Sequence, residues 1–417
     1  MSDKNWVVKD KADSVVIKQL MTALEVSEPL ANLMAQRDIT SYEEAESFFR
    51  PSLEAMHDPF LMKGMNMAVD RISSAIDKGE KILIYGDYDV DGTTSVALLY
   101  SFLKNFHSNL DYYIPNRDTE GYGVSKRGLD YARENNCNLV ITIDCGIKAV
   151  EKVEYARSLG LDVIICDHHL QGDKVPAAVA VLDPKQNACS YPFKELSGCG
   201  VGFKLIHAYS IVNGRPFDDL IPYLDLVAIS IASDIVPIVG ENRVLAHYGL
   251  LQLNKSPRIG IKEIIKSARI RNEITIEDVI FKIGPRINAA GRMESGTRAV
   301  DLLVSTQQNL AAEISNEIDS CNTRRRSFDR NITTEALRMI SGDQRLSNAR
   351  TTVLYNPEWH KGVIGIVASR LIETHYRPTV ILTESNGKAT GSARSVAGYD
   401  LYQAIERCSP LLESFGG

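Results

Sequence analysis

Short apolar runs alternate with longer amphipathic segments between residues 81 and 169. Such runs predict buried strands, and apolar residues that recur every three or four positions predict helices. The expected strands cover residues 81–86, 110–115, 138–146 and 162–169, and the expected helices cover residues 93–106, 124–136 and 147–160. This alternation is typical of βαβ units, so the sequence predicts an α/β fold with a mostly parallel sheet.

The rest of the chain divides by its pattern into three further parts. Residues 1–70 form a helical N-terminal segment, in which Ser41 and Glu44 have the spacing of a capping box. A main domain is expected over 71–305, followed by a long polar linker helix over 306–345. A smaller α/β domain follows over 346–417, with strands at 351–356, 377–384 and 388–395 and a helix at 362–375.

Composition restricts the class of protein. A length of 417 residues suits two or three domains, and 44% hydrophobic with 24% charged residues is ordinary for a globular enzyme. The seven scattered cysteines form no C-x-x-C pair, which favours reduced thiols over a zinc ribbon. No secretory leader and no membrane-spanning run is visible, so a cytoplasmic location is expected. A net charge of −6 argues against general polyanion binding and leaves room for a local basic channel.

The first expected strand runs into three closely spaced carboxylates, Asp87, Asp89 and Asp91. Carboxylates this close repel one another unless protons or cations compensate them. An EF-hand loop begins in the same way but needs a glutamate at its twelfth position, where this chain has Leu98. A solvated acidic turn and a metal site at the end of a parallel strand remain, and the position of the motif favours the metal site.

Two later strands also end in acidic motifs. Asp144 follows the third strand, and Asp167, His168 and His169 follow the fourth. Because parallel strands present their carboxyl ends at one edge of a sheet, we expect these motifs to converge in one crevice. Neighbouring side chains of an extended segment diverge, so one histidine can bind a metal while the other faces a phosphate.

Weaker signals lie further along the chain. Residues 191–210 contain a glycine-rich turn before a helix, which can receive a phosphate or simply pack closely. Asp234 ends an apolar helical run and needs a partner, either a metal or a hydrogen bond at the helix end. Arg286 and Arg292 suit phosphate contacts, with surface ion pairs as the alternative. The arginines near residue 325 form either a solvated face or a track for a polyanion.

The order of the motifs resembles the DHH phosphoesterase superfamily and, within it, the RecJ-type exonucleases. The motifs that carry the resemblance are GDYDVDGTT, IPNRDTEGYG, ITIDCG, DHH, YPFKELSGCGVGFK, LDLVAISIASDIVP, GPRINAAGRM, EWHKGVIGIVASRL and GSARS. The resemblance implies a DHH domain and a smaller DHH-associated domain joined by a long helix. It implies a metal-dependent 5′→3′ exonuclease that hydrolyses single-stranded DNA to 5′-mononucleotides in repair and recombination.

The resemblance also assigns residues. Two Mn²⁺ or Mg²⁺ ions are held by Asp87, Asp89, Asp91, Asp144, His168 and Asp234. Asp144 bridges the ions, and His169 faces the scissile phosphate beside Asp167. The resemblance implies phosphate contacts from Arg117, Ser392 and Arg394 and places His360 near the cleft. Arg286 and Arg292 are also expected to contact the substrate, because two guanidinium groups in a closely packed segment suit a phosphate. The implied substrate is a single strand with a 5′ phosphate, with a single-strand-binding protein and a helicase as partners and no membrane. Tyr122 is either a base-stacking residue or an ordinary loop residue.

Two departures from the family pattern qualify these expectations. Asp183 stands where the family usually has asparagine, and the chain ends at Gly417, where the family continues into further sequence that usually includes an OB-fold. The smaller domain is therefore expected to be truncated. Two rival functions remain: a phosphodiesterase of oligoribonucleotides or cyclic dinucleotides, and a non-catalytic nucleic-acid-binding scaffold.

Overall fold

The structure is a computed structural model, and it describes residues 6–413, 415 and 416. The chain divides into two compact units, an N-terminal unit over Val8–Asp319 and a C-terminal unit that begins at Ser320. Across the described residues, no helix combines the length and apolar character that crossing a membrane requires.

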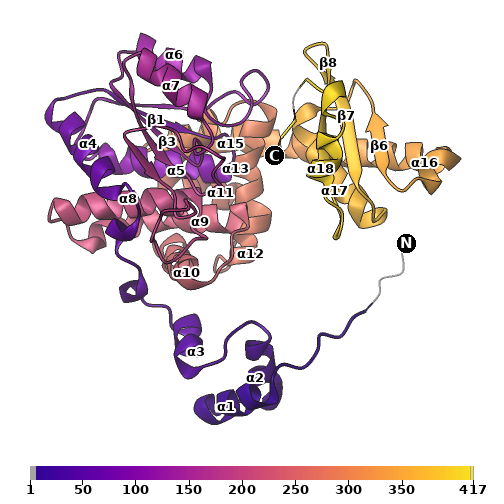
Figure 1. The fold of residues 1–417 in the computed structure, drawn as a ribbon, viewed down its shortest axis with the longest axis horizontal. Helices are drawn as coiled ribbons and strands as arrows, with labels where there is room; N and C mark the ends of the chain where they lie inside the picture. The colour runs from indigo at the N-terminus through magenta and orange to yellow at the C-terminus, as the bar shows by residue number, and fades with distance from the viewer. Residues whose placement is uncertain (1–5, 414, 417) are drawn as a thin grey trace. The chain divides into compact units, whose positions relative to one another are not determined.

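A five-stranded parallel sheet forms the centre of the N-terminal unit (Figure 1). Its order is β2-β1-β3-β4-β5, with bounds β1 Ile82–Gly86, β2 Leu110–Tyr113, β3 Leu139–Ile143, β4 Asp162–Cys166 and β5 Ala180–Leu182. The predicted parallel sheet is confirmed. The sequence pattern missed β5, which is only three residues long, and it extended β3 and β4 into motifs that lie just beyond the strand ends.

Apolar residues on both faces of the sheet explain its helical layers. In β1, Ile82 and Ile84 face one core, while Leu83 and Tyr85 face another. Helices α5, α8 and α9 belong to the first core, and α6 and α7 cover the opposite face (Figure 1). Their bounds are α5 Val90–Leu103, α6 Lys126–Glu134, α7 Val150–Ser158, α8 Gly198–Val212 and α9 Leu224–Asp234. Burial on both faces is the usual environment of parallel strands.

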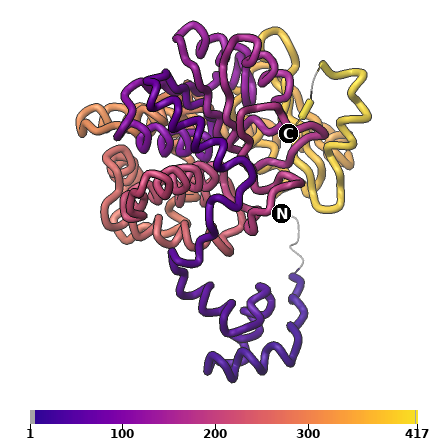
Figure 2. The backbone as a smooth tube through the Cα atoms, turned by 60° about the vertical axis from the view of Figure 1, so that its left-hand side comes forward, coloured from indigo at the N-terminus to yellow at the C-terminus, as the bar shows by residue number. Residues whose placement is uncertain are grey.

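The first helices have a small core of their own, which includes Ile17, Leu20, Ala31 and Met34. Figure 2 traces them in indigo. They are α1 Ser14–Leu24, α2 Glu28–Ala35 and α3 Tyr42–Phe49, and the predicted capping box at the start of α3 is confirmed. The remaining helices of this unit are α4 Met65–Asp77, α10 Gly240–Lys255, α11 Ile259–Ser267, α12 Ile276–Asp278, α13 Gly284–Met293 and α14 Thr297–Val304, with 3₁₀ helices at Leu53–Ala55, Pro59–Leu61 and Phe217–Tyr223 and a π-helix at Val279–Ile283.

One long helix, α15 Gln308–Gly342, continues into the C-terminal unit, as the polar pattern predicts. The C-terminal unit has a three-stranded sheet of order β6-β7-β8, in which β6 and β7 are parallel and β8 is antiparallel. Its elements are α16 Gln344–Asn348, β6 Thr352–Tyr355, α17 Lys361–Thr374, β7 Thr379–Ser385, β8 Lys388–Arg394, α18 Leu401–Glu406 and the turn Ser409–Leu411.

Candidate metal centre

Four neighbouring strands end at an acidic edge of the sheet. The last residues of β1, β3 and β4 are register partners, and each is followed by an aspartate: Asp87, Asp144 and Asp167. Asp183 follows the last residue of β5 in the same way. All four side chains are buried. The parallel arrangement therefore brings the acidic motifs together, as the sequence pattern predicts.

Helix α5 begins earlier than expected. The sequence pattern placed its start at Thr93, whereas the helix starts at Val90 and Asp89 is its N-cap. The side chain of Asp89 accepts a hydrogen bond of 3.0 Å from the backbone N–H of Gly92. The N-cap preference of aspartate explains this start, and it places Asp91 in the first turn of the helix.

The carboxylate of Asp91 binds the start of α8. It accepts hydrogen bonds from the backbone N–H groups of Gly198 (2.7 Å) and Cys199 (2.8 Å) and from the hydroxyl of Ser230 (2.7 Å). Of the two interpretations of this glycine-rich turn, phosphate binding and close packing, the structure favours close packing. A helix N-terminus attracts an anion, and the anion that these two N–H groups bind is the protein's own carboxylate.

Asp144 lies against the same helix start. Its backbone is left-handed, with φ of 60°, a conformation that costs about 1–2 kcal/mol for most residues and less for aspartate. A Cβ atom at Gly198 would lie 2.7 Å from Cβ and 2.8 Å from Oδ1 of Asp144. Only glycine at position 198 therefore lets α8 approach the carboxylate this closely.

His168 lies among three carboxylates. Its Nε2 atom is 3.2 Å from Oδ1 of Asp144, 3.6 Å from Oδ2 of Asp234 and 3.7 Å from Oδ2 of Asp91. Asp234 is the last residue of α9, and Ile235 ends the helix in a left-handed conformation. Two sets of possible ligand atoms within 4.8 Å of one another share His168: Asp144, His168 and His169, and Asp91, His168 and Asp234.

His169 is held by Asp167 and by Tyr122. Nδ1 of His169 lies 2.7 Å from Oδ1 of Asp167, whose Oδ2 accepts a hydrogen bond from the backbone N–H of Ile147. The hydroxyl of Tyr122 lies 3.2 Å from Nε2 of His169. Burial lowers the pKa of His169, but the hydrogen bond and charge of Asp167 outweigh this effect and raise it above its usual value.

The carboxylates raise one another's pKa. Burial first, and the charge of Asp89 second, raise the pKa of Asp87 to about 8. Burial and the charge of Asp91 raise the pKa of Asp234 to about 7, and the same two causes raise the pKa of Asp144 well above its usual value. Perturbed carboxylates of this kind gather at functional sites, where a cation compensates their charge.

These residues fit a divalent cation. Among the described residues, no hydrogen-bond partner exists for either ring nitrogen of His168, although the side chain is buried. Burial lowers the pKa of His168, which favours the neutral imidazole that binds metals. Ligand atoms at right angles on an octahedral ion with bonds of about 2.1 Å lie about 3 Å apart, close to the 3.2 Å between His168 and Asp144. Carboxylate oxygens with one imidazole suit Mn²⁺ or Mg²⁺.

Two of the expected substrate-binding arginines lie near this edge. The guanidinium of Arg117 lies over the ring of Tyr88, 5.0 Å from its centre. Helix α13 packs against the same residue, because a Cβ atom at Gly291 would lie 2.3 Å from the carbonyl oxygen of Tyr88. Burial and then the charge of Asp87 raise the pKa of Tyr88 to about 12, and the charges of Arg117 and Arg292 oppose them.

Arg286 has protein partners on all three of its guanidinium nitrogens. Nε lies 2.9 Å from Oδ1 of Asp319, Nη1 donates to the carbonyl oxygen of Lys282, and Nη2 donates to that of Ser267. Its side chain is 15% exposed. The structure therefore favours the alternative of an intramolecular ion pair for Arg286.

The other expected substrate residues lie in the C-terminal unit. His360 is the N-cap of α17 and stacks on Phe328, with ring centres 5.3 Å apart. Ser392 and Arg394 lie on β8, and a Cβ atom at Gly365 of α17 would lie 2.9 Å from Oγ of Ser392. The start of α17 and this part of β8 are therefore adjacent.

Sequence reasoning missed two residues of the acidic edge. Asp183 was given no role, yet burial raises its pKa to about 7, and its Oδ2 atom has no partner among the described residues. The apolar run before Asp183 was the signal that could have shown a fourth strand end. Ser230 lies inside an apolar helix, and no local pattern indicates its hydrogen bond to Asp91.

The parallel sheet with an acidic, histidine-bearing edge is the fold and site of the DHH class. The family model described as "DHH family, N-terminal domain" matches residues 81–231, and the "DHHA1 domain" model matches residues 348–417.

Two curated relatives and one solved structure narrow the assignment further than the two domain models do. The single-stranded-DNA-specific exonuclease RecJ of Bacillus subtilis is 41% identical over all of this chain and 52% of its own length. The Escherichia coli RecJ is 36% identical over 93% of this chain and 70% of its own length. RecJ of Thermus thermophilus in complex with Mn²⁺ has a TM-score of 0.84 at 28% identity, covering 98% of this chain and 58% of that one. The chain belongs to the RecJ family, and it spans about half the length of the first of these relatives.

Proposed function

We propose that this chain is a metal-dependent exonuclease that removes 5′-mononucleotides from single-stranded DNA in repair and recombination. The observation that carries the proposal is His168 with its Nε2 atom 3.2–3.7 Å from three carboxylates at the carboxyl edge of the sheet. The named activities of the RecJ relatives support the choice of substrate.

The acidic edge is the proposed site of two Mn²⁺ or Mg²⁺ ions. The proposed ligands are Asp87, Asp89, Asp91, Asp144, His168 and Asp234, with Asp144 between the two ions. Bound in this way, the ions would lower the pKa of a water molecule and stabilise charge on the phosphate oxygens.

The chain's own residues would orient the phosphate. Asp167 holds His169 through Nδ1 and raises its pKa, which favours the protonated imidazolium. In that form Nε2 can donate a hydrogen bond to the scissile phosphate once the Tyr122 hydroxyl yields that position. Arg117 and Arg292 are proposed to offset charge on non-bridging oxygens, since guanidinium groups match phosphate geometry. Ser392, Arg394 and His360 are proposed contacts for a 5′-terminal phosphate.

The proposal extends to the compartment in which the enzyme works and to its partner proteins. All seven cysteines are free thiols, which supports a reducing compartment such as the cytoplasm. A helicase and a single-strand-binding protein are proposed partners, because both produce or hold the single strands that the enzyme would degrade.

A digestion assay tests the proposal. The substrates are a 5′-labelled single strand, its duplex and a cyclic dinucleotide, each with Mn²⁺ and with EDTA. Metal-dependent release of labelled mononucleotides from the single strand is expected. Cleavage of the dinucleotide alone would favour a small-substrate phosphodiesterase, and metal-independent binding without cleavage would favour a scaffold.

A further inference from the structure

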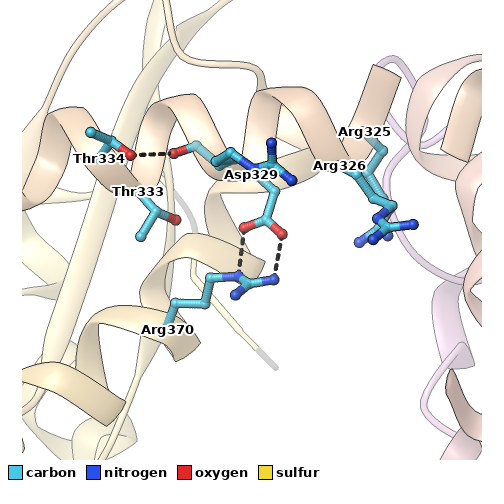
Figure 3. Close-up of a pocket in the computed structure, with 7 residues that line it drawn as sticks. Arg325, Arg326, Asp329, Thr333, Thr334 and Arg370 are labelled. Atoms are coloured by element: carbon cyan, nitrogen blue, oxygen red, sulfur yellow. Dashed lines mark hydrogen bonds and ion pairs between the residues drawn. The ribbon is translucent and has the colours of Figure 1, made fainter. Parts of the chain in front are cut away.

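A cavity in the C-terminal unit gathers four arginines, none of which belongs to the acidic edge of the sheet. It has a volume of about 280 Å³ and lies between α15 and α17 (Figure 3). Its lining comprises Arg325, Arg326, Asp329, Arg330, Thr333, Thr334 and Arg370. A water molecule occupies about 30 Å³ in the liquid, so the cavity has room for a phosphate group and its hydration.

Only one of the four arginines is neutralised by a carboxylate in the cavity. Asp329 is 2% exposed and forms a two-pronged ion pair with Arg370, with contacts of 2.8 Å on both sides (Figure 3). Arg325 donates to the neutral amide oxygen of Asn322. Within the part of the chain that the structure describes, neither Arg326 nor Arg330 has a carboxylate within ion-pair distance.

The remaining positive charge is concentrated on one half-buried arginine, Arg325, and three exposed ones. Four guanidinium groups and one carboxylate leave a net charge of +3 in the cavity, although the whole chain carries −6. Burial lowers the pKa of Arg325, and the charges of Arg326 and Arg370 lower it further against the opposing effect of Asp329. An anion bound between these guanidinium groups would offset both the burial of Arg325 and the repulsion from Arg326 and Arg370.

A second observation concerns the polar lining of the cavity. The hydroxyl oxygen of Thr333 is buried and has no hydrogen-bond partner among the described residues. A buried hydroxyl is normally satisfied, so this group needs an acceptor that the surrounding protein does not supply. A phosphate oxygen is such an acceptor.

We propose that this arginine cavity binds backbone phosphates of a single-stranded nucleic acid, as a site separate from the proposed metal centre. The proposal rests on the proposed function. Arg326 and Arg330 are one helical turn apart, about 6 Å along α15, which suits an extended row of anions better than a single ion. Arg370, fixed by Asp329, forms the opposite wall.

Binding without cleavage tests this site independently of the nuclease activity. The probe is a 3′-fluorescein oligothymidylate of about 20 nucleotides with a 5′ hydroxyl, measured by anisotropy in EDTA over a series of salt concentrations. Each lost phosphate contact makes the slope of log K against log salt shallower by about 0.7. We expect a change of about 0.7 for Arg326→Gln and for Arg330→Gln, and about 1.4 for the double variant.

Arg338→Gln is the matched control, because Arg338 lies on the same helix, is exposed and does not line the cavity. Equal losses in the control and the cavity variants, or wild-type slopes in the double variant, would overturn the proposal. So would a wild-type chain that binds no oligonucleotide in EDTA.

Calorimetric titration with inorganic phosphate and with thymidine monophosphate tests whether the cavity takes the phosphates of a nucleic-acid backbone or those of small molecules. If the double variant loses only these small ligands, the phosphate site stands and the backbone assignment is wrong. A failed digestion assay with intact cavity binding would count against the nuclease proposal alone.

Discussion

Nδ1 of His169 lies 2.7 Å from Oδ1 of Asp167. This contact fixes the imidazole so that Nε2 faces away from Asp167 toward the acidic edge, where Tyr122 lies. The Asp167→Asn substitution would remove the charge that raises the pKa of His169 and stabilises its protonated form. We expect kcat on single-stranded DNA with Mn²⁺ to fall by about 10²–10⁴-fold while the fold is kept. Unchanged kcat, with KM also unchanged, would show that His169 needs no orientation by Asp167.

Asp144→Asn separates catalysis from folding. The asparagine keeps the tolerance for the left-handed backbone at this position but removes a carboxylate from a crowded, buried cluster. We therefore expect loss of turnover together with a higher melting temperature in EDTA than that of the wild type. Turnover retained in Mn²⁺ would contradict the proposed bridging role.

Asp91→Ala should have the opposite effect on stability. It removes the acceptor for two backbone N–H groups of α8 and for the hydroxyl of Ser230. Each buried donor left without an acceptor costs about 1–3 kcal/mol, so we expect a loss of several kcal/mol in urea unfolding. A stability equal to that of Asp144→Asn would show that these hydrogen bonds contribute nothing.

The pH dependence of stability in EDTA follows from the raised carboxyl pKa values. The folded state keeps protons on Asp87 to about pH 8 and on Asp234 to about pH 7, whereas the unfolded chain loses them near pH 4. The unfolded state then binds fewer protons, so stability falls as pH rises from about 4 to 8, by up to about 1.4 kcal/mol per pH unit for each group.

Urea unfolding at a series of pH values in EDTA measures this trend. The Asp87→Asn and Asp234→Asn double variant should flatten it, and saturating Mn²⁺ should reverse it, because the cation favours the ionised carboxylates. A wild-type unfolding free energy that does not change with pH in EDTA would contradict the raised pKa values of these buried carboxyl groups.

Arg394→Ala tests the proposed contact with the strand end. We expect the ratio of kcat/KM for a 5′-phosphorylated strand to that for a 5′-hydroxyl strand to fall about tenfold, the effect of losing about 1.4 kcal/mol of a charge-assisted contact. Arg377→Ala is unsuitable as a control, since Arg377 binds several backbone carbonyls. Arg350→Ala, at an exposed position, serves instead. An unchanged ratio would exclude the end-binding role.

Much of the fold could be predicted from the chain, because apolar strands and periodic helices leave local marks in the sequence. Parallel strands also made the convergence of Asp87, Asp144 and Asp167 predictable from the sequence. The capping box at Ser41 and the long helix α15 were equally local.

The sequence was least informative where distant segments meet. The hydrogen bonds of Asp91 to α8 join residues 107 and 108 positions apart, so no local pattern could reveal that the helix start was already satisfied. The ion pair of Arg286 with Asp319 is a similar long-range contact. Short β5 gave too weak a signal to place Asp183 at a strand end.

The position of Asp91 has a consequence for the order of assembly. Its carboxylate is oriented by the start of α8, which follows it by more than a hundred residues in the chain. During synthesis, a chain that has emerged only as far as α7 already contains the first acidic motifs but lacks the helix that aligns Asp91. Cation binding by this centre would then report completed folding of the sheet and its helices, and a nascent chain would be inert toward DNA until that stage.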